Sequence, residues 1–547
     1  MVPEEAPVVV ETPGGLSVSY RGRLLYSSRD PARLPRRLAE ACDPGPARLH
    51  IVASPLLWYG VDELLARMGE GSKLLCVEAD PALAELSLRR APAGLLERPE
   101  LAFIATDSPE ALFEAARRLG RFRASGLVAL SGGEALHDQL YRRMASLAAA
   151  DIEASWRNRA ALLGMGRLWA RNIFENAAAL PGVAPAPLPC LAGPVAVCGA
   201  GPSLEEALPL LARNRGRLGI VACDTALGSL LASGIEPDLV VCLEAQAHNL
   251  PDFTCLGDRP IRLVADLSSH PATFRAVRGP KHLTATRIAD SPFLARASAF
   301  AASAFPGCLP MPPLGSVGVH ALALARSLGP GPVLALGLDF SFEAGKTHAR
   351  GSPSLLAEER RLSRITRWPS QYAVAFRQRT KPAPCPALGD GRPLLSDPIL
   401  LSYAAVLGEV ASSPGPLVLD ARGRGPSIGA RRIGLDGVEG LIAASPVAGA
   451  VSPPPPARAA GAAAVQAAAR GFLAGEAARL DALYDIMKGR PGARAGEGGR
   501  LVAECDYLYW HFADAERAAV LPQDFLNRLL PEVEWWSRRL ARLLASL

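Results

Sequence analysis

The sequence lacks most of the short motifs that would assign a chain of 547 residues to a common class of protein. None of its 10 cysteines belongs to a Cys-x-x-Cys pair, so neither a zinc site nor a dithiol redox site of that spacing is predicted. No run of apolar residues approaches the length of a membrane helix, and the acidic opening MVPEEAPVVVETPGG predicts no secretory leader. These absences favour a cytoplasmic protein with reduced thiols and no membrane contact.

The chain also has little excess charge of one sign. It contains 59 basic and 53 acidic residues, and the net charge of +6 is spread along the chain. Aromatic residues make up only 6%, and no arginine cluster interleaves with them. A nucleic-acid partner is therefore not predicted. What is present is 49% hydrophobic residues, an ordinary share that predicts sizeable cores in two or three domains.

The first 148 residues alternate short apolar strands with amphipathic segments, which predicts a Rossmann-like α/β domain. The predicted strands are Arg48–Ser54, Lys73–Asp80, Leu101–Thr106 and Ala124–Leu130. The first turn, VASPLLWYGVDE, has no Gly-x-Gly, so we do not expect it to bind a nucleotide. Glu78, at the end of the second strand, is interpreted as a capping or surface acid.

The rest of the chain divides by composition into four parts. We predict a helical connector and linker over 149–190, a central α/β domain over 191–444, a Pro/Ala linker over 445–460 and a helical domain over 461–547. The closing apolar stripe, VEWWSRRLARLLASL, is typical of a core or an oligomer contact, so an oligomer through this region is possible.

A glycine turn follows the first strand of the central domain in VAVCGAGPSLEEALPLL. Gly199 and Gly201 leave room for a ligand beside the backbone, but no third glycine and no Gly-Lys-Ser/Thr follows. Ser203 and Glu206 have the spacing of a capping box, which predicts a helix start that offers free N–H groups to an anion. The alternative is that the glycines are needed only for a tight strand–helix turn.

Polar residues follow several other predicted strands, whose carboxyl ends should line one crevice of a parallel sheet. Asp224 and Glu244 end two of them, and each has helix capping as its structural alternative. Ser316 opens a helix, and Asp339 ends the strand Val333–Leu336. His348 lies in the polar loop beyond Asp339, where an acid–base histidine would be well placed, whereas His320 falls in an apolar helical pattern and is interpreted as a packed histidine.

Five of these segments, in this order, resemble the motility accessory factors, which are bacterial glycosyltransferases of flagellin. The segments are GAGPSL, CDTAL…GIEPDLVVCLEAQ, GSVGVHALALARSLG, LGLDF and KTHARG, and the resemblance covers roughly residues 156–441. The central domain of that family is similar to bacterial sialyltransferases. The resemblance implies an α/β chain with an N-terminal Rossmann-like domain, a central sialyltransferase-like domain with a mostly parallel sheet, and a C-terminal helical domain.

The resemblance also implies a reaction. A nonulosonic acid of the pseudaminic or legionaminic type would pass from a CMP-sugar to Ser or Thr of flagellin with inversion, without a metal and without a cofactor beyond the donor. His348 would be the general base, with Asp339 and Arg350 as further catalytic residues. The donor-binding residues would be Gly199, Ala200, Gly201, Pro202, Ser203, Asp224, Thr225, Glu244, Gln246, Ser316, Lys346 and Thr347.

The sequence departs from the family pattern at three places, one of which is the turn VASPLLWYG, where many family members carry glycines. Ser341 stands where the sialyltransferases carry a tyrosine that assists the leaving phosphate, and Glu244 replaces the more usual aspartate. Two alternatives therefore stay open. One is a magnesium–ATP enzyme like the hydroxymethylpterin diphosphokinases, which share this domain, and the other is a non-catalytic accessory protein that binds flagellin.

Overall fold

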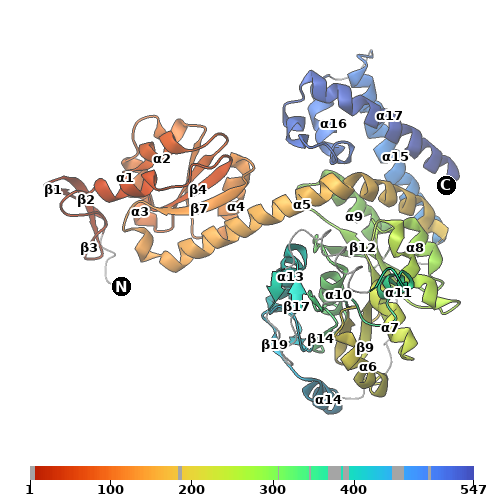
Figure 1. Ribbon diagram of the computed structural model, residues 1–547. Coiled ribbons are helices and arrows are strands. Elements are labelled where there is room, and N and C mark those ends of the chain that lie inside the picture. The colour runs from red at the N-terminus through yellow and green to blue at the C-terminus, as the bar shows by residue number, and fades with distance from the viewer. Residues whose placement is uncertain are drawn as a thin grey trace. The chain divides into compact units, whose positions relative to one another are not determined.

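A computed structural model describes residues 6–182, 188–305, 307–343, 346–367, 383–385, 394–445, 461–490 and 495–547. The chain forms two compact units, Met1–Ala161 and Leu162–Leu547, and the division falls inside the long helix α5 (Asp138–Ala179) (Figure 1). The predicted linker at 445–460 and part of the connector, 183–187, lie almost wholly outside the described residues. The domain boundaries set from composition stay predictions.

The first unit contains the predicted Rossmann-like sheet, whose four strands are all parallel in the order β6-β5-β4-β7. Each strand matches its prediction to within two residues. The strands are β4 (Arg48–Ala53), β5 (Lys73–Glu78), β6 (Leu101–Ala105) and β7 (Ala124–Ala129). The helices between and before them are α1 (Arg33–Glu40), α2 (Val61–Arg67), α3 (Pro81–Arg89) and α4 (Pro109–Leu119).

Glu78 is neither a cap nor a surface acid, because its side chain is buried at the end of β5. Its carboxylate accepts hydrogen bonds from Ser54 Oγ at 2.6 Å and from the Tyr141 hydroxyl at 3.0 Å. Burial raises the pKa of Glu78, and these hydrogen bonds oppose the rise. The carboxylate therefore ties β5 to the turn after β4 and to α5, and the sequence alone gave no sign of these partners.

An antiparallel sheet that was not predicted precedes the parallel sheet in the first unit, in the order β1-β2-β3. Its strands are β1 (Val8–Thr12), β2 (Gly15–Tyr20) and β3 (Arg23–Leu24). Tyr26, just beyond it, donates its hydroxyl to the Pro55 carbonyl at 3.0 Å and accepts from the Leu57 N–H at 3.1 Å. The turn after β4 is thus held by the chain's own tyrosine.

The second unit is built on a nine-stranded sheet in which every pair of neighbours is parallel, in the order β13-β12-β11-β10-β9-β8-β14-β18-β19. The strands are β8 (Val195–Cys198), β9 (Gly219–Cys223), β10 (Leu239–Cys242), β11 (Leu263–Asp266), β12 (Lys281–Thr286), β13 (Leu309–Met311), β14 (Val333–Leu336), β18 (Val418–Asp420) and β19 (Arg431–Arg432). The apolar runs VAVCGA, LGIVACD, LVVCLEA, IRLVAD, VLALGLDF and PLVLDA predict six of these strands. The sequence does not predict β12, β13 and β19, which are the least apolar strands. A small antiparallel sheet, β15 (Phe342–Glu343), β17 (Leu394–Ser396) and β16 (Ala383–Cys385), follows β14.

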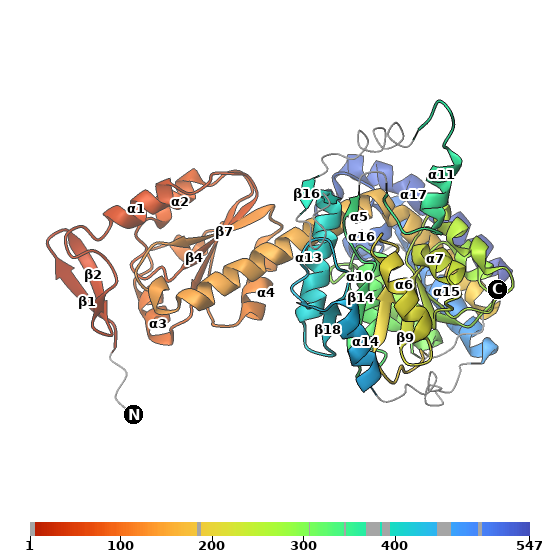
Figure 2. The same cartoon turned by 60° about the horizontal axis from the view of Figure 1, so that its bottom comes forward.

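Two hydrophobic cores hold the helices to this sheet. One surrounds β8, β9, β14 and β18 and includes four helices that are labelled in Figure 2. They are α6 (Leu204–Arg213), α10 (Val317–Ala325), α13 (Pro398–Ser412) and α14 (Leu435–Ala444). The other surrounds β10, β11 and β12 and includes α5, α8 (Pro271–Ala276), α9 (Pro292–Ala304), α15 (Ala462–Met487) and α17 (Gln523–Ser546). Further helices are α7 (Leu227–Ala232), α11 (Pro353–Arg360) and α16 (Gly498–Glu504).

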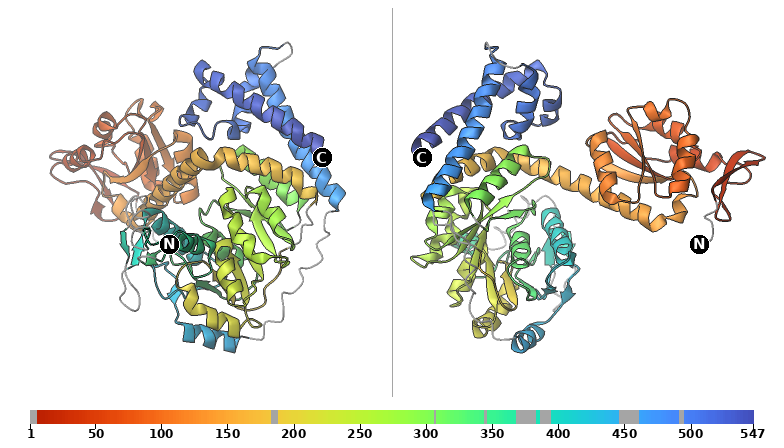
Figure 3. Two further views of the ribbon diagram at one scale, coloured as in Figure 1. Left: turned by 45° about the vertical axis from the view of Figure 1, so that its right-hand side comes forward. Right: turned by 180° about the vertical axis from the view of Figure 1, so that it is seen from behind.

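The C-terminal region is helical, as expected, and its two long helices α15 and α17 lie side by side (Figure 3). Along α17, Leu529, Val533, Trp536 and Leu540 are fully buried within the chain, whereas Leu543 and Leu544 near its end are partly exposed. The buried part of the stripe is therefore core. An oligomer through the region stays a prediction. Within the described ranges, no helix combines the length and the apolar character that crossing a membrane requires.

Two asparagines of α5, one helical turn apart, bind the loops that follow β10 and β11. The Asn172 side-chain amide donates to the carbonyls of Ala245 and Ser268, both at 2.9 Å. The Asn176 amide donates to the carbonyls of Leu267 and Ser269, both at 2.8 Å. Both side chains are buried, so these bonds satisfy carbonyls that water cannot reach. They fix α5 to the carboxyl edge of the sheet.

The substitution Asn176→Ala leaves two buried carbonyls without their donor, and each such loss costs about 1–3 kcal/mol. We expect the free energy of unfolding, measured with denaturant, to fall by at least that amount. The control Asn527→Ala, at an exposed residue whose side chain accepts a bond only from Gln523, should change it by less than about 0.5 kcal/mol. Equal effects of the two substitutions would contradict the role given to α5.

Candidate functional site at the switch point of the central sheet

The order of strands in the central sheet reverses between β8 and β14. From β8 the chain adds β9 to β13 on one side, and then β14 returns to the other side of β8. At such a switch point the connections leave in opposite directions, and in folds of this kind ligands bind in the crevice beyond the carboxyl ends of the two strands. The glycine turn follows β8 and Asp339 follows β14, so the predicted residues of both turns meet at this point.

The two turns touch through their backbones. A Cβ atom on Gly199 would lie 2.4 Å from the Gly337 carbonyl oxygen, and a Cβ on Gly337 would lie 2.2 Å from the Gly199 oxygen. The Gly201 N–H donates to the Gly337 carbonyl at 2.7 Å, and a Cβ on Gly201 would lie 2.6 Å from both that oxygen and Asp339 Cγ. The glycines are therefore required by the approach of two strand ends, which was the alternative to leaving room for a ligand.

Ser203 does not cap α6, which corrects the predicted capping box. Its backbone is already helical and its hydroxyl makes no capping hydrogen bond. Instead, Ser203 donates its N–H to Asp339 Oδ2 at 2.8 Å and its hydroxyl to Asp339 Oδ1. The carboxylate of Asp339 thus occupies the position in which the sequence predicted an external anion.

Burial raises the pKa of Asp339 to about 6, although the bonds from Ser203 and the charges of Arg422 and Arg424 act in the opposite direction. The residue after it, Phe340, has a φ of 47°, which is strained for a bulky side chain. Ser396 holds this conformation by donating its hydroxyl to the Phe340 carbonyl at 2.7 Å. Strained backbone of this kind gathers at functional sites.

The loop that carries the predicted base lies against the glycine turn. Ala349 donates its N–H to the Ala200 carbonyl at 2.8 Å, which places His348 beside the turn. His348 Nδ1 lies 3.0 Å from Thr347 Oγ1, and Thr347 also reaches Glu358 of α11 at 3.4 Å. Pro202 is buried in the same turn, where its carbonyl accepts from the Glu205 N–H at 3.3 Å.

Lys346, predicted to bind the donor, and Arg350, predicted to be catalytic, are both paired with Glu205, in the first turn of α6. Lys346 Nζ lies 2.9 Å from Glu205 Oε2, and Arg350 binds the same carboxylate through its N–H at 2.7 Å and its guanidinium at 3.4 Å. Burial alone would raise the pKa of Glu205, but the bonds to the two cations outweigh it and hold this pKa below its usual range.

Asp224 lies at the same edge but is fully buried and turned toward its own neighbours. Its carboxylate accepts from the Thr225 N–H at 2.9 Å and from the Asn249 amide at 3.0 Å. Burial raises its pKa, and burial together with the charge of Asp224 raises the pKa of nearby Asp252 to about 7. Asp224 caps neither the turn that it begins nor α7, so helix capping is not its role, and its buried bonds are structural.

Glu244 and Ser316 also lie at this edge. Glu244 accepts from the Gln246 N–H at 2.8 Å, while the Gln246 side chain is exposed and reaches Met165 at 3.5 Å. Ser316 caps α10 by accepting from the Gly318 N–H at 3.3 Å, and a Cβ on Gly318 would lie 2.5 Å from Leu338, just after β14. Within α10, His320 is packed as expected, and burial lowers its pKa to about 4.

Sequence reasoning missed the loop that follows β18. Arg422 is completely buried, forms two bonds with the Asp420 carboxylate at 2.7 and 2.8 Å, and donates to the Leu338 carbonyl at 3.0 Å. Arg424 binds Glu206 of α6 and Glu343 of β15. The segment DARGRG, which directly follows the apolar run of β18, could have indicated this loop. Like the segments after β8 and β14, it combines glycine with polar residues at the end of a strand.

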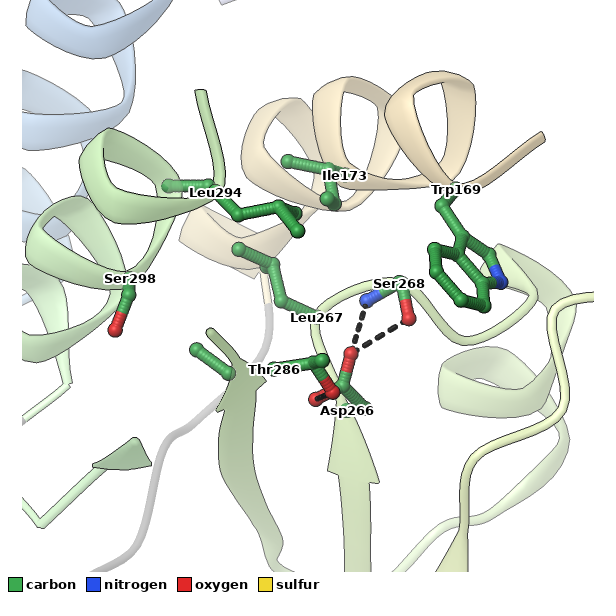
Figure 4. A pocket seen from close by; sticks show the side chains of 10 residues that line it. Trp169, Ile173, Asp266, Leu267, Ser268, Thr286, Leu294 and Ser298 are labelled. Carbon is green, nitrogen blue, oxygen red and sulfur yellow. Dashed lines mark hydrogen bonds between the residues drawn. The ribbon is translucent and has the colours of Figure 1, made fainter. Parts of the chain in front are cut away.

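A cavity of about 30 Å³ lies elsewhere on the sheet, where β11 and β12 end beneath α5 and α9 (Figure 4). Asp266 binds Ser268 and Thr286 there, at 2.6 and 2.9 Å, and Trp169 closes one side. This volume holds about two water molecules, which is too small for a sugar nucleotide. None of the predicted site residues lines it.

Comparison with known proteins agrees with this architecture. Residues 171–345 match the model of the family described as 6-hydroxymethylpterin diphosphokinase MptE-like. An uncharacterized protein of Treponema pallidum (strain Nichols) is 29% identical over 574 residues, covering 100% of this chain and 97% of the relative. The solved MAf glycosyltransferase from Magnetospirillum magneticum AMB-1 matches with a TM-score of 0.53 and 16% identity, covering 100% of this chain and 92% of that one.

The chain has the motility accessory factor fold. The match to the solved structure extends over the whole chain, beyond the region on which the resemblance rested. It confirms the resemblance and the predicted fold class, including the helical C-terminal region. The MptE-like match lies in the central region, where the sheet of this chain has its switch point.

The contact between the two glycine turns leads to a prediction for stability. In Gly201→Ala, the added Cβ meets a backbone oxygen and the Asp339 carboxyl, so we expect the free energy of unfolding to fall by about 1–3 kcal/mol. The control Gly216→Ala places its Cβ in open space and should be nearly neutral. A Gly201→Ala protein as stable as the control would mean that the turns do not pack as described.

Asp339 should also make stability depend on pH. The unfolded chain releases this proton near pH 4 and the folded chain near pH 6, so the contribution of Asp339 is complete below pH 4 and is lost as the pH rises through 6. The unfolding free energy of the wild type minus that of Asp339→Asn should therefore fall by up to about 3 kcal/mol between pH 4 and 7. Other titrating groups cancel in this difference. A difference that stays constant with pH would contradict the raised pKa.

Proposed function

We propose that this chain is a cytoplasmic glycosyltransferase that moves a nonulosonic acid, of the pseudaminic or legionaminic type, from a CMP-sugar to Ser or Thr of flagellin. The observation that carries the proposal is the meeting of the turns after β8 and β14 at the switch point, in a chain whose whole length matches the fold of a MAf glycosyltransferase. His348, the Asp339 carboxyl with its raised pKa and several cations lie near these turns. A transfer reaction at an acidic sugar needs groups of these kinds.

In this mechanism His348 takes the proton from the attacking hydroxyl. The tautomer in which Nδ1–H donates to Thr347 Oγ1 leaves the lone pair on Nε2 for that proton. The acceptor oxygen forms the new bond to the anomeric carbon as the bond from that carbon to the phosphate oxygen breaks, and the configuration inverts. The phosphate leaves as CMP, and the cations of the crevice stabilise its charge.

The MptE-like match favours one other candidate, a magnesium–ATP diphosphokinase. Such an enzyme needs carboxylates that face the metal and the phosphates. Asp224 and Asp339 are buried and bonded to Thr225, Asn249 and Ser203, which supports the glycosyltransferase instead. Calorimetry separates the candidates, because binding of CMP supports the first, magnesium-dependent binding of ATP supports the second, and binding of neither supports a non-catalytic flagellin-binding protein.

The substitution His348→Ala tests the base. Loss of a general base typically lowers the rate about 10²- to 10⁴-fold, so transfer to flagellin, followed by intact protein mass, should fall in that range while CMP binding is nearly unchanged. The control His511→Gln alters a histidine that lies beside Glu532, in the C-terminal helical region, and should leave transfer unaffected. Near-normal transfer by His348→Ala would remove this histidine from the mechanism.

A further inference from the structure

Arg424 lies at the switch point, on a loop that the structure fixes unusually firmly. Gly425, with a φ of 89°, touches the Asp339 carbonyl so closely that a Cβ there would lie 2.2 Å from the oxygen. On the other side of Arg424, the buried pair of Arg422 and Asp420 anchors the loop to the end of β18. The guanidinium of Arg424 is therefore presented from a rigid backbone beside both turns of the crevice.

The present partners of Arg424 are two carboxylates that differ in exposure. Glu343 of β15 is mostly buried, whereas the Glu206 side chain is 54% exposed and extends from the first turn of α6. Asp339 is close enough to interact electrostatically with the same guanidinium. An exposed carboxylate loses little when it returns to water, so Glu206 can give way to another anion.

The crevice contains few other donors for a phosphate. The turn amides of Gly199, Gly201 and Ser203 already donate to protein oxygens. Lys346 and Arg350 share Glu205, and the Arg350 side chain is 80% exposed. Arg424, with 12% exposure, combines a fixed position with a planar guanidinium that fits two oxygens of one phosphate.

We propose that Arg424 binds the phosphate that joins nucleoside to sugar in the donor, and that this phosphate replaces the Glu206 carboxylate. The inference rests on the proposed function for the identity of the nucleotide. It assigns the site's main anion contact to the loop after β18 and not to the glycine turn. Glu206 then pairs with Arg424 when no donor is bound, and it competes with the donor phosphate for the Arg424 guanidinium.

The test compares CMP with cytidine, which lacks the phosphate, by calorimetry on four proteins. Arg424→Gln should weaken CMP binding about 10- to 100-fold, the range expected for a lost charge-assisted contact, and should leave cytidine binding unchanged. Glu206→Gln removes the competing carboxylate and should strengthen CMP binding a few-fold. The control Arg213→Gln alters an arginine on α6, the helix that also carries Glu206. It breaks an exposed pair with Glu439 of α14 and should bind CMP as the wild type does.

Equal losses for CMP and cytidine in Arg424→Gln, or no loss for either, would overturn the inference, as would weaker CMP binding in Glu206→Gln. If Arg424→Gln fails to fold, Arg424→Lys keeps the charge but loses the two-oxygen geometry and should still bind CMP less tightly. If the wild type binds magnesium–ATP and not CMP, the proposed donor is wrong. The comparison is then repeated with ATP and adenosine, and a loss of ATP binding alone in Arg424→Gln would still assign the phosphate contact to Arg424. A wild type that binds neither nucleotide overturns both proposals.

Discussion

The contact between the strand ends of β8 and β14 is the constraint on which the rest of the central unit depends. Two parallel strands that leave in opposite directions must bring their turns together, and here the backbones of Gly199 and Gly337 meet with no room for a side chain. The Asp339 carboxylate then joins the turns by accepting both donors of Ser203. A side chain on either glycine would force the two strands apart and would open the crevice at its base.

Charge pairing extends this contact outward. The first turn of α6 supplies Glu205 and Glu206, which hold cations from two different loops, those after β15 and after β18. Beneath them, Arg422 and Asp420 form a pair that is completely buried, where the loss of either partner would leave an uncompensated charge. The outer pairs are more exposed and exchange more easily, so the rim of the crevice can rearrange while its base stays fixed.

This division explains how a site without a conventional phosphate loop can still accept an anion. The donors of the glycine turn are used to build the site. The cations at the rim are held by carboxylates, one of which, Glu206, is proposed to be replaced by the donor phosphate. The likeness to the MAf glycosyltransferase fold extends over the whole chain, whereas the MptE-like match covers residues 171–345.

The sequence by itself determined the elements whose pattern is local. The apolar strands of both sheets, the helical C-terminal region and the order of motifs from GAGPSL to KTHARG were all predictable, because periodicity and turn residues depend on near neighbours. The sequence did not predict β12 and β13, which contain polar residues or proline, or the two-residue strand β19, because none of them has an apolar run of its own. The gathering of Asp224, Asp339 and His348 at one edge followed from the rule that parallel strands end together.

Only the tertiary structure decided what each residue does there. Ser203 has the sequence of a helix cap, yet a carboxylate 136 positions away takes its donors. The sequence predicts Glu78 to be a capping or surface acid, but its side chain is buried and bonded to Tyr141. Nothing in the sequence distinguishes Arg424 from the other arginines, yet it lies beside Asp339. The physical reason is that burial and hydrogen-bond partners are set by which strands become neighbours, and that choice depends on packing between segments far apart in the chain.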